Sequence, residues 1–305
     1  MTARPILSAP ELAPYRDEPR QAPSGRVGKT GILAMRFEDR GERSVLAHLY
    51  RKTPLLVQQA LYWDEALPGL PCVYMITTSG CVLQGDRLQV GIEMGPGAMA
   101  HVTTQSATKV HEMDANFASQ LQTVTLSEGA YLELMPGMTI PHRHSRFLSH
   151  TAVTIDRSAT LLLSELVMPG RKYHGQGESF EYDVYSTTVT ASRPDGTALF
   201  TEKLLIEPAR APVRLAGVMR GHDVFANVVL CTPKAHADAV LERVVAGRGA
   251  SSVIAGASRL PGDAGLIYKV LGPESEPVRA KIREFWAATR AVVLGKPVPP
   301  VPLWG

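Results

Sequence analysis

Two acidic residues lie on strand faces that are otherwise apolar. Glu165 belongs to a β-like run over residues 160–168, and Glu202 belongs to a run over residues 198–206. Because side chains alternate between the two faces of a strand, each carboxylate points with the apolar residues of its run. These apolar neighbours are Leu161, Leu163 and Val167 for Glu165, and Phe200, Leu204 and Ile206 for Glu202. An ionised carboxylate buried without a partner costs roughly several kcal/mol, so each acid needs a base, a proton, bound water or a cation.

The bases available to these acids leave two interpretations open. Arg171, Lys109 and Lys203 could form buried ion pairs, although Lys203 points to the opposite strand face from Glu202. Alternatively, the acids meet a cation and have a functional role. A third acid, Asp86, follows a glycine in a turn, where aspartate is ordinary turn chemistry, so by itself it is interpreted as a turn residue.

Nine histidines include the segment His142-Arg143-His144, whose H-x-H form would place two imidazoles on one side of a strand. Metal sites need several converging ligands, and no carboxylate occurs between His144 and His150. We interpret the segment as a polar surface loop that begins at Pro141, and we expect no tight metal site. The alternative is a β-rich metal-dependent enzyme that uses His142 and His144.

No catalytic constellation is visible elsewhere in the sequence. It contains no G-x-S-x-G elbow, no H-E-x-x-H helix and no paired Cys and His nucleophile. Cys81 is followed by apolar residues and has no basic neighbour to activate it, so we interpret it as structural. The segment GRVGKT at residues 25–30 resembles the end of a phosphate-binding P-loop, but Pro23 replaces the first glycine of that motif and no strand precedes it. We therefore expect neither a nucleotide site nor an enzyme.

The runs that carry the acids belong to a chain dominated by strand patterns. A small-residue turn followed by an alternating strand recurs at residues 97, 129 and 158, a spacing of about 30 residues. Repetition at such a period indicates units that bury their faces by stacking on one another. We therefore predict a mainly β fold of stacked layers, β-helical or sandwich-like, with about two α-helices, the last near the C-terminus.

The expected elements follow from alternation, turn residues and helical spacing. Strand patterns cover residues 31–37, 44–51 and 55–61, a meander over 72–109, then 160–168, 224–231 and a hairpin of 178–190 with 198–206. Helical spacing predicts one helix over residues 234–245 and another from Pro277, with Gly295 as its cap. The last helix should bury one face, consisting of Val278, Ile282, Phe285, Trp286, Thr289, Val292 and Val293.

Proline content separates a leader and a tail from the rest of the chain. Residues 1–24 carry five prolines, and we expect a mobile leader there. Residues 25–305 should form a single domain, β-rich over 28–231 and helix-containing over 232–296, with an extended tail over 297–305. With 45% hydrophobic residues and an apolar last helix and tail, we also expect an apolar surface that a partner covers.

Composition limits the class of partner and the compartment. The chain has 305 residues, 32 basic and 29 acidic, and a formal net charge of +3, so we expect no nucleic-acid partner. Its three cysteines, Cys72, Cys81 and Cys231, form no C-x-x-C pair, which favours a reducing compartment. No apolar run approaches the roughly 18 residues that a membrane span needs, and no signal-peptide pattern opens the chain. We therefore expect a cytoplasmic protein without a membrane partner.

Several short motifs match one protein family in order and spacing. A turn ending at Gly85-Asp86 is followed by GPGA at residues 95–98 and by TTQSATK at residues 103–109. Further matches are Pro54-Leu55 with Val57-Gln58, Gly129-Ala130 with Leu132-Glu133, Gly170-Arg171, Gly177-Glu178 with Phe180, and Gly256-Ala257-Ser258. From roughly Gly28 to the C-terminus, the chain resembles the urease accessory protein UreD family, also called UreH.

The resemblance implies a nickel-pathway chaperone and not an enzyme. Members of the family join the accessory proteins UreF and UreG and dock on apo-urease, with Ni²⁺ passing transiently and no tightly bound cofactor. An internal water-filled nickel route is also implied, to which Asp86, Glu165, Glu202 and the hydroxyl of Thr108 correspond in this chain. The candidate supporting residues are Lys109, Glu133, Arg171 and Glu178. The alternative is a passive β-scaffold with no metal role.

Two departures from the family pattern bear on this prediction. Cys81 and Gln84 fill positions of the turn that are glycine in the family, and glycine permits positive φ and close backbone approach. The acid often found after the family's Leu-Pro is Met138 here, so no carboxylate is predicted at that position.

Overall fold

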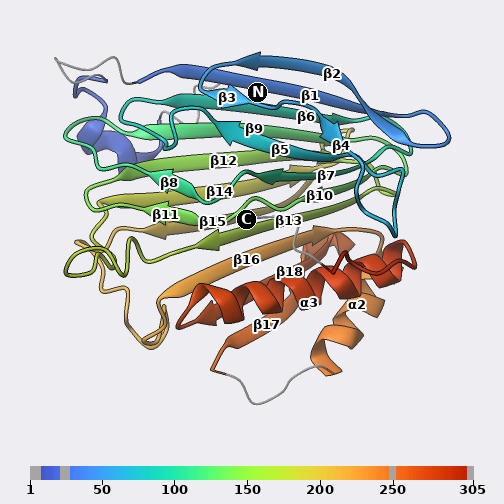
Figure 1. The fold of residues 1–305 in the computed structure, drawn as a ribbon. Coiled ribbons are helices and arrows are strands. Elements are labelled where there is room, and N and C mark those ends of the chain that lie inside the picture. Colours follow the sequence, from blue (N-terminus) through green and yellow to red (C-terminus); the bar gives the residue numbers. More distant parts are fainter. Residues whose placement is uncertain (1–7, 21–27, 247–251, 301–305) are drawn as a thin grey trace.

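The computed structural model of this chain describes residues 8–20, 28–246 and 252–300 and consists of two facing β-sheets with two α-helices on one outer side (Figure 1). The seven-stranded sheet has the order β15-β14-β12-β9-β6-β1-β2. The eleven-stranded sheet has the order β17-β18-β16-β13-β10-β7-β5-β3, with β4, β8 and β11 attached beside this path. The mainly β fold class is therefore confirmed.

The strands and helices have the following bounds. The seven-stranded sheet contains β1 (Thr30–Asp39), β2 (Ser44–Lys52), β6 (Arg87–Met94), β9 (Ala118–Leu126), β12 (Arg146–Ile155), β14 (Val184–Ser192) and β15 (Ala198–Ile206). The eleven-stranded sheet contains β3 (Leu55–Leu56), β4 (Ala60–Leu61), β5 (Cys72–Thr77), β7 (Met99–Thr104), β8 (Thr108–Val110), β10 (Tyr131–Leu134), β11 (Thr139–Pro141), β13 (Thr160–Val167), β16 (Val224–Cys231), β17 (Ile254–Arg259) and β18 (Gly265–Gly272). The helices are η1 (Pro10–Tyr15), α2 (Lys234–Ala246), η2 (Pro261–Asp263) and α3 (Ser275–Val293).

The predicted repeat corresponds to stacked strands. In the eleven-stranded sheet β7, β10 and β13 run parallel, with Met99, Tyr131 and Thr160 in register. In the seven-stranded sheet β6, β9, β12 and β14 are parallel neighbours in the same way. The turns before β7 and β10 lie on each other, because a Cβ atom on Gly129 would lie 3.9 Å from Gly97 Cα. Successive repeats therefore place equivalent residues side by side, and their apolar residues fill the space between the sheets.

The meander predicted over residues 72–109 is wrong. β5 and β7 are parallel neighbours in the eleven-stranded sheet, whereas β6 lies in the seven-stranded sheet between β1 and β9. A strand with one apolar face looks the same in sequence whether its turn leads to a neighbour in the same sheet or across to the facing sheet. The run at residues 55–61 also differs from the prediction, because it forms the two short strands β3 and β4.

The hairpin and both α-helices are confirmed. β14 and β15 pair antiparallel on either side of the turn at residues 193–196, although β14 begins at Val184 and not at residue 178. α2 spans the predicted region, and α3 begins two residues before Pro277. Gly295 has a φ of 63°, the left-handed conformation typical of a residue that ends a helix.

The apolar face of α3 is covered by the eleven-stranded sheet, so this face does not contribute to the apolar surface expected of the last helix and the tail. Val278, Ile282, Phe285 and Trp286 are buried in a cluster with residues of β13, β16 and β18. Val292 and Val293, which were predicted on the same face, are only partly buried. The helix instead buries Arg290, a residue that apolar periodicity does not identify.

Residues 8–20 are folded against the seven-stranded sheet, so the prediction of a mobile leader is wrong for this segment. Helix η1 carries Leu12 into a small buried cluster, where its exposed fraction is 0%. Glu11 accepts hydrogen bonds of 2.6 Å from Ser186 Oγ and from Lys203 Nζ. Prolines therefore do not keep this segment away from the domain, because one leucine and one acid attach it to the sheet.

The remaining parts of the predicted leader, residues 1–7 and 21–27, lie outside the described residues. Most of the P-loop-like segment at 25–30 lies outside them as well, and the tail is described only to residue 300. Within the described part of the chain, no helix combines the length and apolar character that crossing a bilayer requires.

A fully buried charge cluster attaches α3 to the eleven-stranded sheet. Arg290 Nε donates to Glu133 Oε1 at 2.6 Å, and Arg290 Nη2 donates to Glu133 Oε2 at 2.9 Å. Arg290 Nη1 also donates to Asp64 Oδ2 at 2.5 Å. Tyr131 Oη and Trp286 Nε1 donate to Glu133 Oε1 at 2.7 and 2.6 Å. One arginine near the end of α3 therefore joins the helix to two segments that are distant in sequence.

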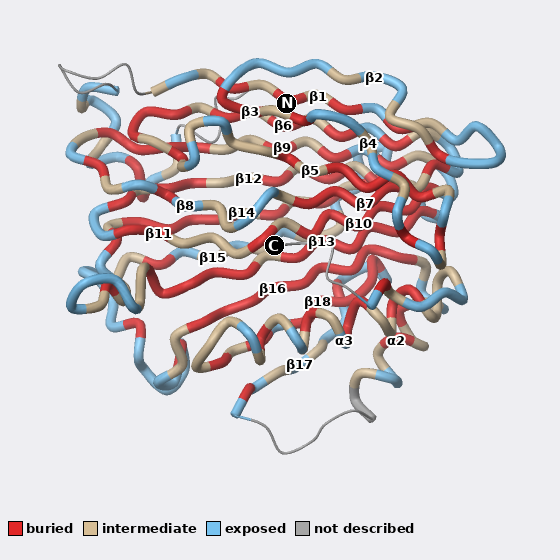
Figure 2. The backbone as a smooth tube through the Cα atoms, in the orientation of Figure 1, coloured by how far each residue is buried: buried red, intermediate tan, exposed pale blue. Residues whose placement is uncertain are grey.

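The charge of Glu133 is compensated within this cluster. Burial alone would raise the pKa of Glu133, but hydrogen bonds from His101 and Arg290, with the charge of Arg290, lower it to about 2. The strands around the cluster are buried over most of their length (Figure 2). A buried charge is tolerated here because it is both paired and hydrogen-bonded.

Replacing Arg290 with methionine should lower the free energy of unfolding by about 3–5 kcal/mol, because Glu133 and Asp64 would keep buried charges without their counter-ion. Urea unfolding followed by circular dichroism measures this loss. Lys281→Met is the matched control, since Lys281 pairs with the more exposed Glu284 on the same helix, and pairs of that kind contribute at most about 1 kcal/mol. Equal stability of the two variants would contradict the role assigned to the cluster.

Candidate functional site

A cavity of about 390 Å³ lies between the two sheets. The seven-stranded sheet contributes its polar residues Gln120, Gln122, Ser149, Thr151 and Thr187, and the eleven-stranded sheet contributes Thr139, Glu165 and Asn227. The loops at residues 80–82 and 105–107 complete the wall at one end. Elsewhere the space between the sheets is filled by apolar side chains, so this polar lining is suited to water or a small polar ligand.

Glu165 is the one acidic residue in the described lining of the cavity. Its Oε1 accepts a hydrogen bond of 2.9 Å from Tyr185 Oη. Burial raises the pKa of Glu165 to about 7, and the charge of Glu202 adds to this effect, whereas hydrogen bonds from Tyr185 and Thr187 oppose it. The predicted apolar face is confirmed, because Leu161, Leu163 and Val167 are all buried between the sheets. Glu165 keeps some accessible surface deep in the protein because it faces the cavity.

Glu202 lies beyond the cavity wall, opposite Val189 in the register of β14 and β15. It accepts a hydrogen bond of 2.5 Å from Lys269 Nζ, which comes from β18 in the other sheet. Lys203 points away from Glu202, as the alternation predicted, and pairs with Glu11. The ion-pair interpretation therefore holds for Glu202, with a base that lies 67 residues away in sequence.

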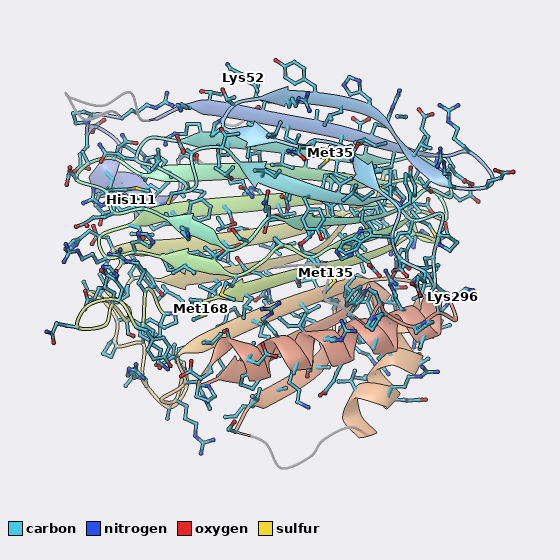
Figure 3. The ribbon with its side chains drawn as sticks, in the orientation of Figure 1. Met35, Lys52, His111, Met135, Met168 and Lys296 are labelled. Atoms are coloured by element: carbon cyan, nitrogen blue, oxygen red, sulfur yellow. The ribbon has the colours of Figure 1, made fainter. Side chains whose placement is uncertain are left out.

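Thr108 and Lys109 lie in the cavity wall at the end formed by β8. The Thr108 backbone N–H donates to Met138 O at 2.8 Å, which fixes the strand at this point. This end of the cavity lies near His111, and Figure 3 shows His111 at the opposite end of the molecule from Lys296, which follows α3. Thr108 and Glu165 therefore line the same cavity, at a distance from the buried cluster around Arg290.

Asp86 does not line the cavity, and its carboxylate holds a turn. Its Oδ1 accepts from the backbone N–H of Lys29 and its Oδ2 from that of Leu83, both at 2.9 Å. Burial raises the pKa of Asp86, opposed by these two backbone hydrogen bonds. The geometry agrees with the turn interpretation and does not bring Asp86 together with Glu165.

The two substituted glycine positions of this turn do not strain the backbone. Gly80 and Gly85 have φ values of 72° and 75°, whereas neither Cys81 nor Gln84 belongs to the described residues with positive φ. Gln84 Oε1 accepts from the backbone N–H groups of Asp114 and Ala115 at 3.0 and 3.3 Å. The side chain that replaces a family glycine therefore attaches the turn to a neighbouring loop.

Three candidate supporting residues lie outside the cavity. Glu133 is on the helix-facing side of the eleven-stranded sheet, in the cluster with Arg290. Arg171 and Glu178 form a bidentate ion pair after β13, with Arg171 Nε donating to Glu178 Oε2 at 2.8 Å and Nη2 to Oε1. Lys109 is therefore the one supporting candidate that lines the cavity.

The H-x-H segment does not bring its two imidazoles together. His142 is buried, and burial together with the charges of Arg171 and His111 lowers its pKa to about 4. His144 is exposed, and its Nδ1 lies 3.4 Å from Asp183 Oδ1. The segment is a turn that follows β11, so the alternation of a strand does not apply to it. In the described ranges, no group of three or more His, Cys, Asp or Glu residues is placed to hold a metal ion.

Sequence reasoning missed three polar residues near Glu165. Tyr185 donates to Glu165, Asn227 lies opposite it in the register of β13 and β16, and Lys269 pairs with Glu202. Asn227 and Lys269 are single polar residues within the apolar runs VFANVVLC and GLIYKVLG. The signal that identified Glu165, a polar residue in an apolar strand, could have identified these two as well.

The described lining of the cavity is rich in oxygen ligands. Carboxylate, hydroxyl and carboxamide oxygens are ligands that divalent cations accept, but tight transition-metal sites use several converging nitrogen or sulfur ligands. Of the cysteines, Cys72 and Cys231 are buried, and burial raises the pKa of each thiol to about 12. The arrangement is therefore suited to weak, transient contact with a cation.

Comparison with known proteins identifies one family along nearly the whole chain. A family model described as UreD urease accessory protein matches residues 29–305. Urease accessory protein UreD 2 of Brucella suis biovar 1 is 54% identical over 297 residues, which cover 97% of this chain and 98% of that protein. Urease accessory protein UreD of Photorhabdus laumondii subsp. laumondii is 51% identical over 299 residues, which cover 98% of this chain and 93% of that protein. The resemblance carried by the short motifs is confirmed.

The raised pKa of Glu165 predicts a pH dependence of stability. Because this pKa rises from 4.5 to about 7 on folding, the folded protein holds the proton more tightly, and stability falls as pH rises through that interval. Glu165→Gln removes the titrating group. Between pH values of about 5 and 8, the free energy of unfolding of wild type should therefore fall by about 1–3 kcal/mol relative to that of this variant. Urea unfolding at both pH values measures the difference. Glu284→Gln, which changes an exposed acid of α3, is the control. A constant difference between wild type and Glu165→Gln would contradict the raised pKa.

Proposed function

This chain belongs to the UreD family of urease accessory proteins, and from that premise we propose that it is a urease maturation chaperone through which nickel passes to the urease apoprotein. It acts together with the accessory proteins UreF and UreG and is not itself an enzyme. Nickel is its cargo and not a resident cofactor. The proposal places the transfer in the cytoplasm, where urease apoprotein and its accessory proteins meet.

The observation that carries the proposal is a buried carboxylate without a base, in a polar cavity between two sheets. In the described structure no Lys, Arg or His contributes to the pKa of Glu165 or forms an ion pair with it. Leaving such a group unpaired costs roughly several kcal/mol, and bound water or a passing cation offsets that cost. A protein with a purely structural role would gain stability from an apolar residue at this position.

Weak binding is a requirement of transfer. A conduction route must bind its cargo favourably enough for entry and weakly enough for release at each stop. One carboxylate with hydroxyl and carboxamide neighbours meets this requirement better than a closed set of imidazoles. In the proposal Glu165 is the inner stop, Thr108 supplies a hydroxyl at the β8 end, and Glu202 lies beyond the wall on the other side. Asp86 acts on the route by fixing the turn, because both of its oxygens bind backbone N–H groups.

Exposed apolar side chains support a partner-binding role. Tyr173, Leu215 and Val218 have exposed fractions of 77%, 55% and 51% and lie in loops, not on α3. Lys172 pairs with both Asp223 and Glu274, which ties these loops together near the start of α3. In the proposal, these three exposed side chains belong to the surface that a protein partner covers.

Co-purification tests the partners. Expressed with UreF, UreG and the urease subunits, the chain should be recovered in a complex with them, and expressed alone it should be recovered in much lower soluble yield, because its exposed apolar loops would stay uncovered. Size-exclusion chromatography of both preparations measures the difference. A monodisperse monomer that is indifferent to UreF would favour the passive scaffold or an independent binding module.

Substitution of the acids tests the route. Glu165→Leu and Glu202→Gln should leave the complex with UreF and UreG intact and lower both the nickel content and the activity of urease severalfold, because each variant removes one negatively charged carboxylate from the path. Nickel per urease active site, measured by elemental analysis, is the readout. The double variant His142→Ala, His144→Ala should change this value little, since the two imidazoles do not converge. Normal assembly with full urease activation by both Glu variants would rule out the route, and so would their unfolding.

A further inference from the structure

Three polar residues form one row across the eleven-stranded sheet next to the cavity. Glu165 of β13 is paired in register with Asn227 of β16, and Asn227 is paired with Lys269 of β18. Directly paired residues of antiparallel strands point to the same face of a sheet. Since Glu165 and Asn227 line the cavity, Lys269 also belongs to the face that looks toward the other sheet.

Lys269 reaches across the space between the sheets. Its Nζ lies 2.5 Å from Glu202 Oε1 on β15, the edge strand of the seven-stranded sheet. Val189, the register partner of Glu202, and Asn227, the register partner of Lys269, both belong to the cavity wall. The ion pair therefore lies one strand further out than the cavity on each sheet, on the edge strand of the seven-stranded sheet and on the strand next to the edge strand β17 of the eleven-stranded sheet.

The accessibility of the two partners agrees with this position. The Lys269 side chain is 49% exposed and that of Glu202 is 22% exposed. Glu202 is nevertheless near enough to Glu165 for its charge to raise the pKa of that acid. The charges of Glu165 and Glu202 therefore interact, and the Lys269 ammonium group pairs with Glu202, the more outward of the two acids.

Asn227 is an unsatisfied polar group between these two acids. Its exposed fraction is 5%, and its Oδ1 is buried without a hydrogen-bond partner in the described structure. A buried carboxamide oxygen without a partner costs roughly 1–3 kcal/mol unless water or a ligand satisfies it. An apolar residue would fit this strand better, so the position is unexplained by packing alone.

We propose that Lys269 is the displaceable counter-ion of Glu202 and closes the lateral side of the cavity, and that a divalent cation meets oxygen donors on both sides of this closure, Glu165 and Asn227 inside the wall and Glu202 outside it. The Lys269 ammonium group neutralises Glu202 while no metal is present. An arriving cation competes for the Glu202 carboxylate, and displacement of Lys269 opens the side of the cavity between β15 and β18. The inference rests on the proposed nickel route and adds to it a side exit and the residue that controls it.

Equilibrium dialysis of the purified full-length chain with Ni²⁺ tests the competition directly. Lys269→Met removes the ammonium group that competes with Ni²⁺ but keeps the length of the side chain. Ni²⁺ should therefore bind this variant about two- to fivefold more tightly than wild type, which is the effect expected of one partly exposed ion pair. Lys269→Arg keeps the charge and should bind like wild type. Adding Asn227→Leu or Glu202→Gln to Lys269→Met should abolish the gain.

Lys281→Met is the matched control, because it removes the same charge from an ion pair on α3, far from the cavity wall. A similar gain in Ni²⁺ affinity for Lys281→Met would overturn the proposal, since the effect would then be one of net charge. Unchanged affinity of Lys269→Met would also overturn it, and Lys269→Gln gives the same test if the methionine variant does not fold. If Lys269→Met leaves the Ni²⁺ affinity unchanged but urease matured with Glu165→Leu is poor in nickel, the counter-ion proposal is contradicted and the proposed nickel route is retained. If urease matured with Glu165→Leu is fully loaded with nickel, the proposed nickel route itself is contradicted.

Discussion

Burying a carboxylate is unfavourable, and the eleven-stranded sheet carries one buried carboxylate on each of its two faces, Glu133 and Glu165. On the helix side, Glu133 is fully buried and accepts hydrogen bonds from Arg290, Trp286 and Tyr131. Because the charge is compensated there, the cluster can attach α3 to the sheet and leave that face dry. Without Arg290, two buried acids would repel each other and the helix would lose its fixed position.

On the opposite side of the same sheet, Glu165 has no such partner. It lies on β13, the strand next to the one that carries Glu133, yet its pKa is about 7 where that of Glu133 is about 2. The difference arises from the partner, since burial raises the pKa in both cases. Glu133 is paired with Arg290, whereas Glu165 has no basic partner and faces a polar cavity between the sheets. In the proposed function, this cavity is the interior through which the cation passes.

The sequence was sufficient for features that depend on local periodicity. Strand alternation placed Glu165 and Glu202 on inward faces, and the spacing of small-residue turns predicted stacked layers. Helical spacing placed α3, but it could not identify Arg290, because a buried arginine requires an acid that is 157 residues away. The same limit applies to Lys269, whose partner lies in the facing sheet, and to β6, which leaves its sequence neighbours for the other sheet. Long-range pairing decides these features, and no local pattern encodes it.

The central claim is that nickel passes through the cavity, and filling the cavity without touching its acids tests this most directly. Val189 lines the cavity on β14, whereas its neighbour Thr188 points to the other face of that sheet, so Val189→Phe and Thr188→Phe differ in the face that receives the added ring. The measurement is nickel per active site in urease matured with each variant, after the accessory complex is shown to assemble. The account predicts nickel-poor urease from Val189→Phe and fully loaded urease from Thr188→Phe. Fully loaded urease from Val189→Phe would contradict it.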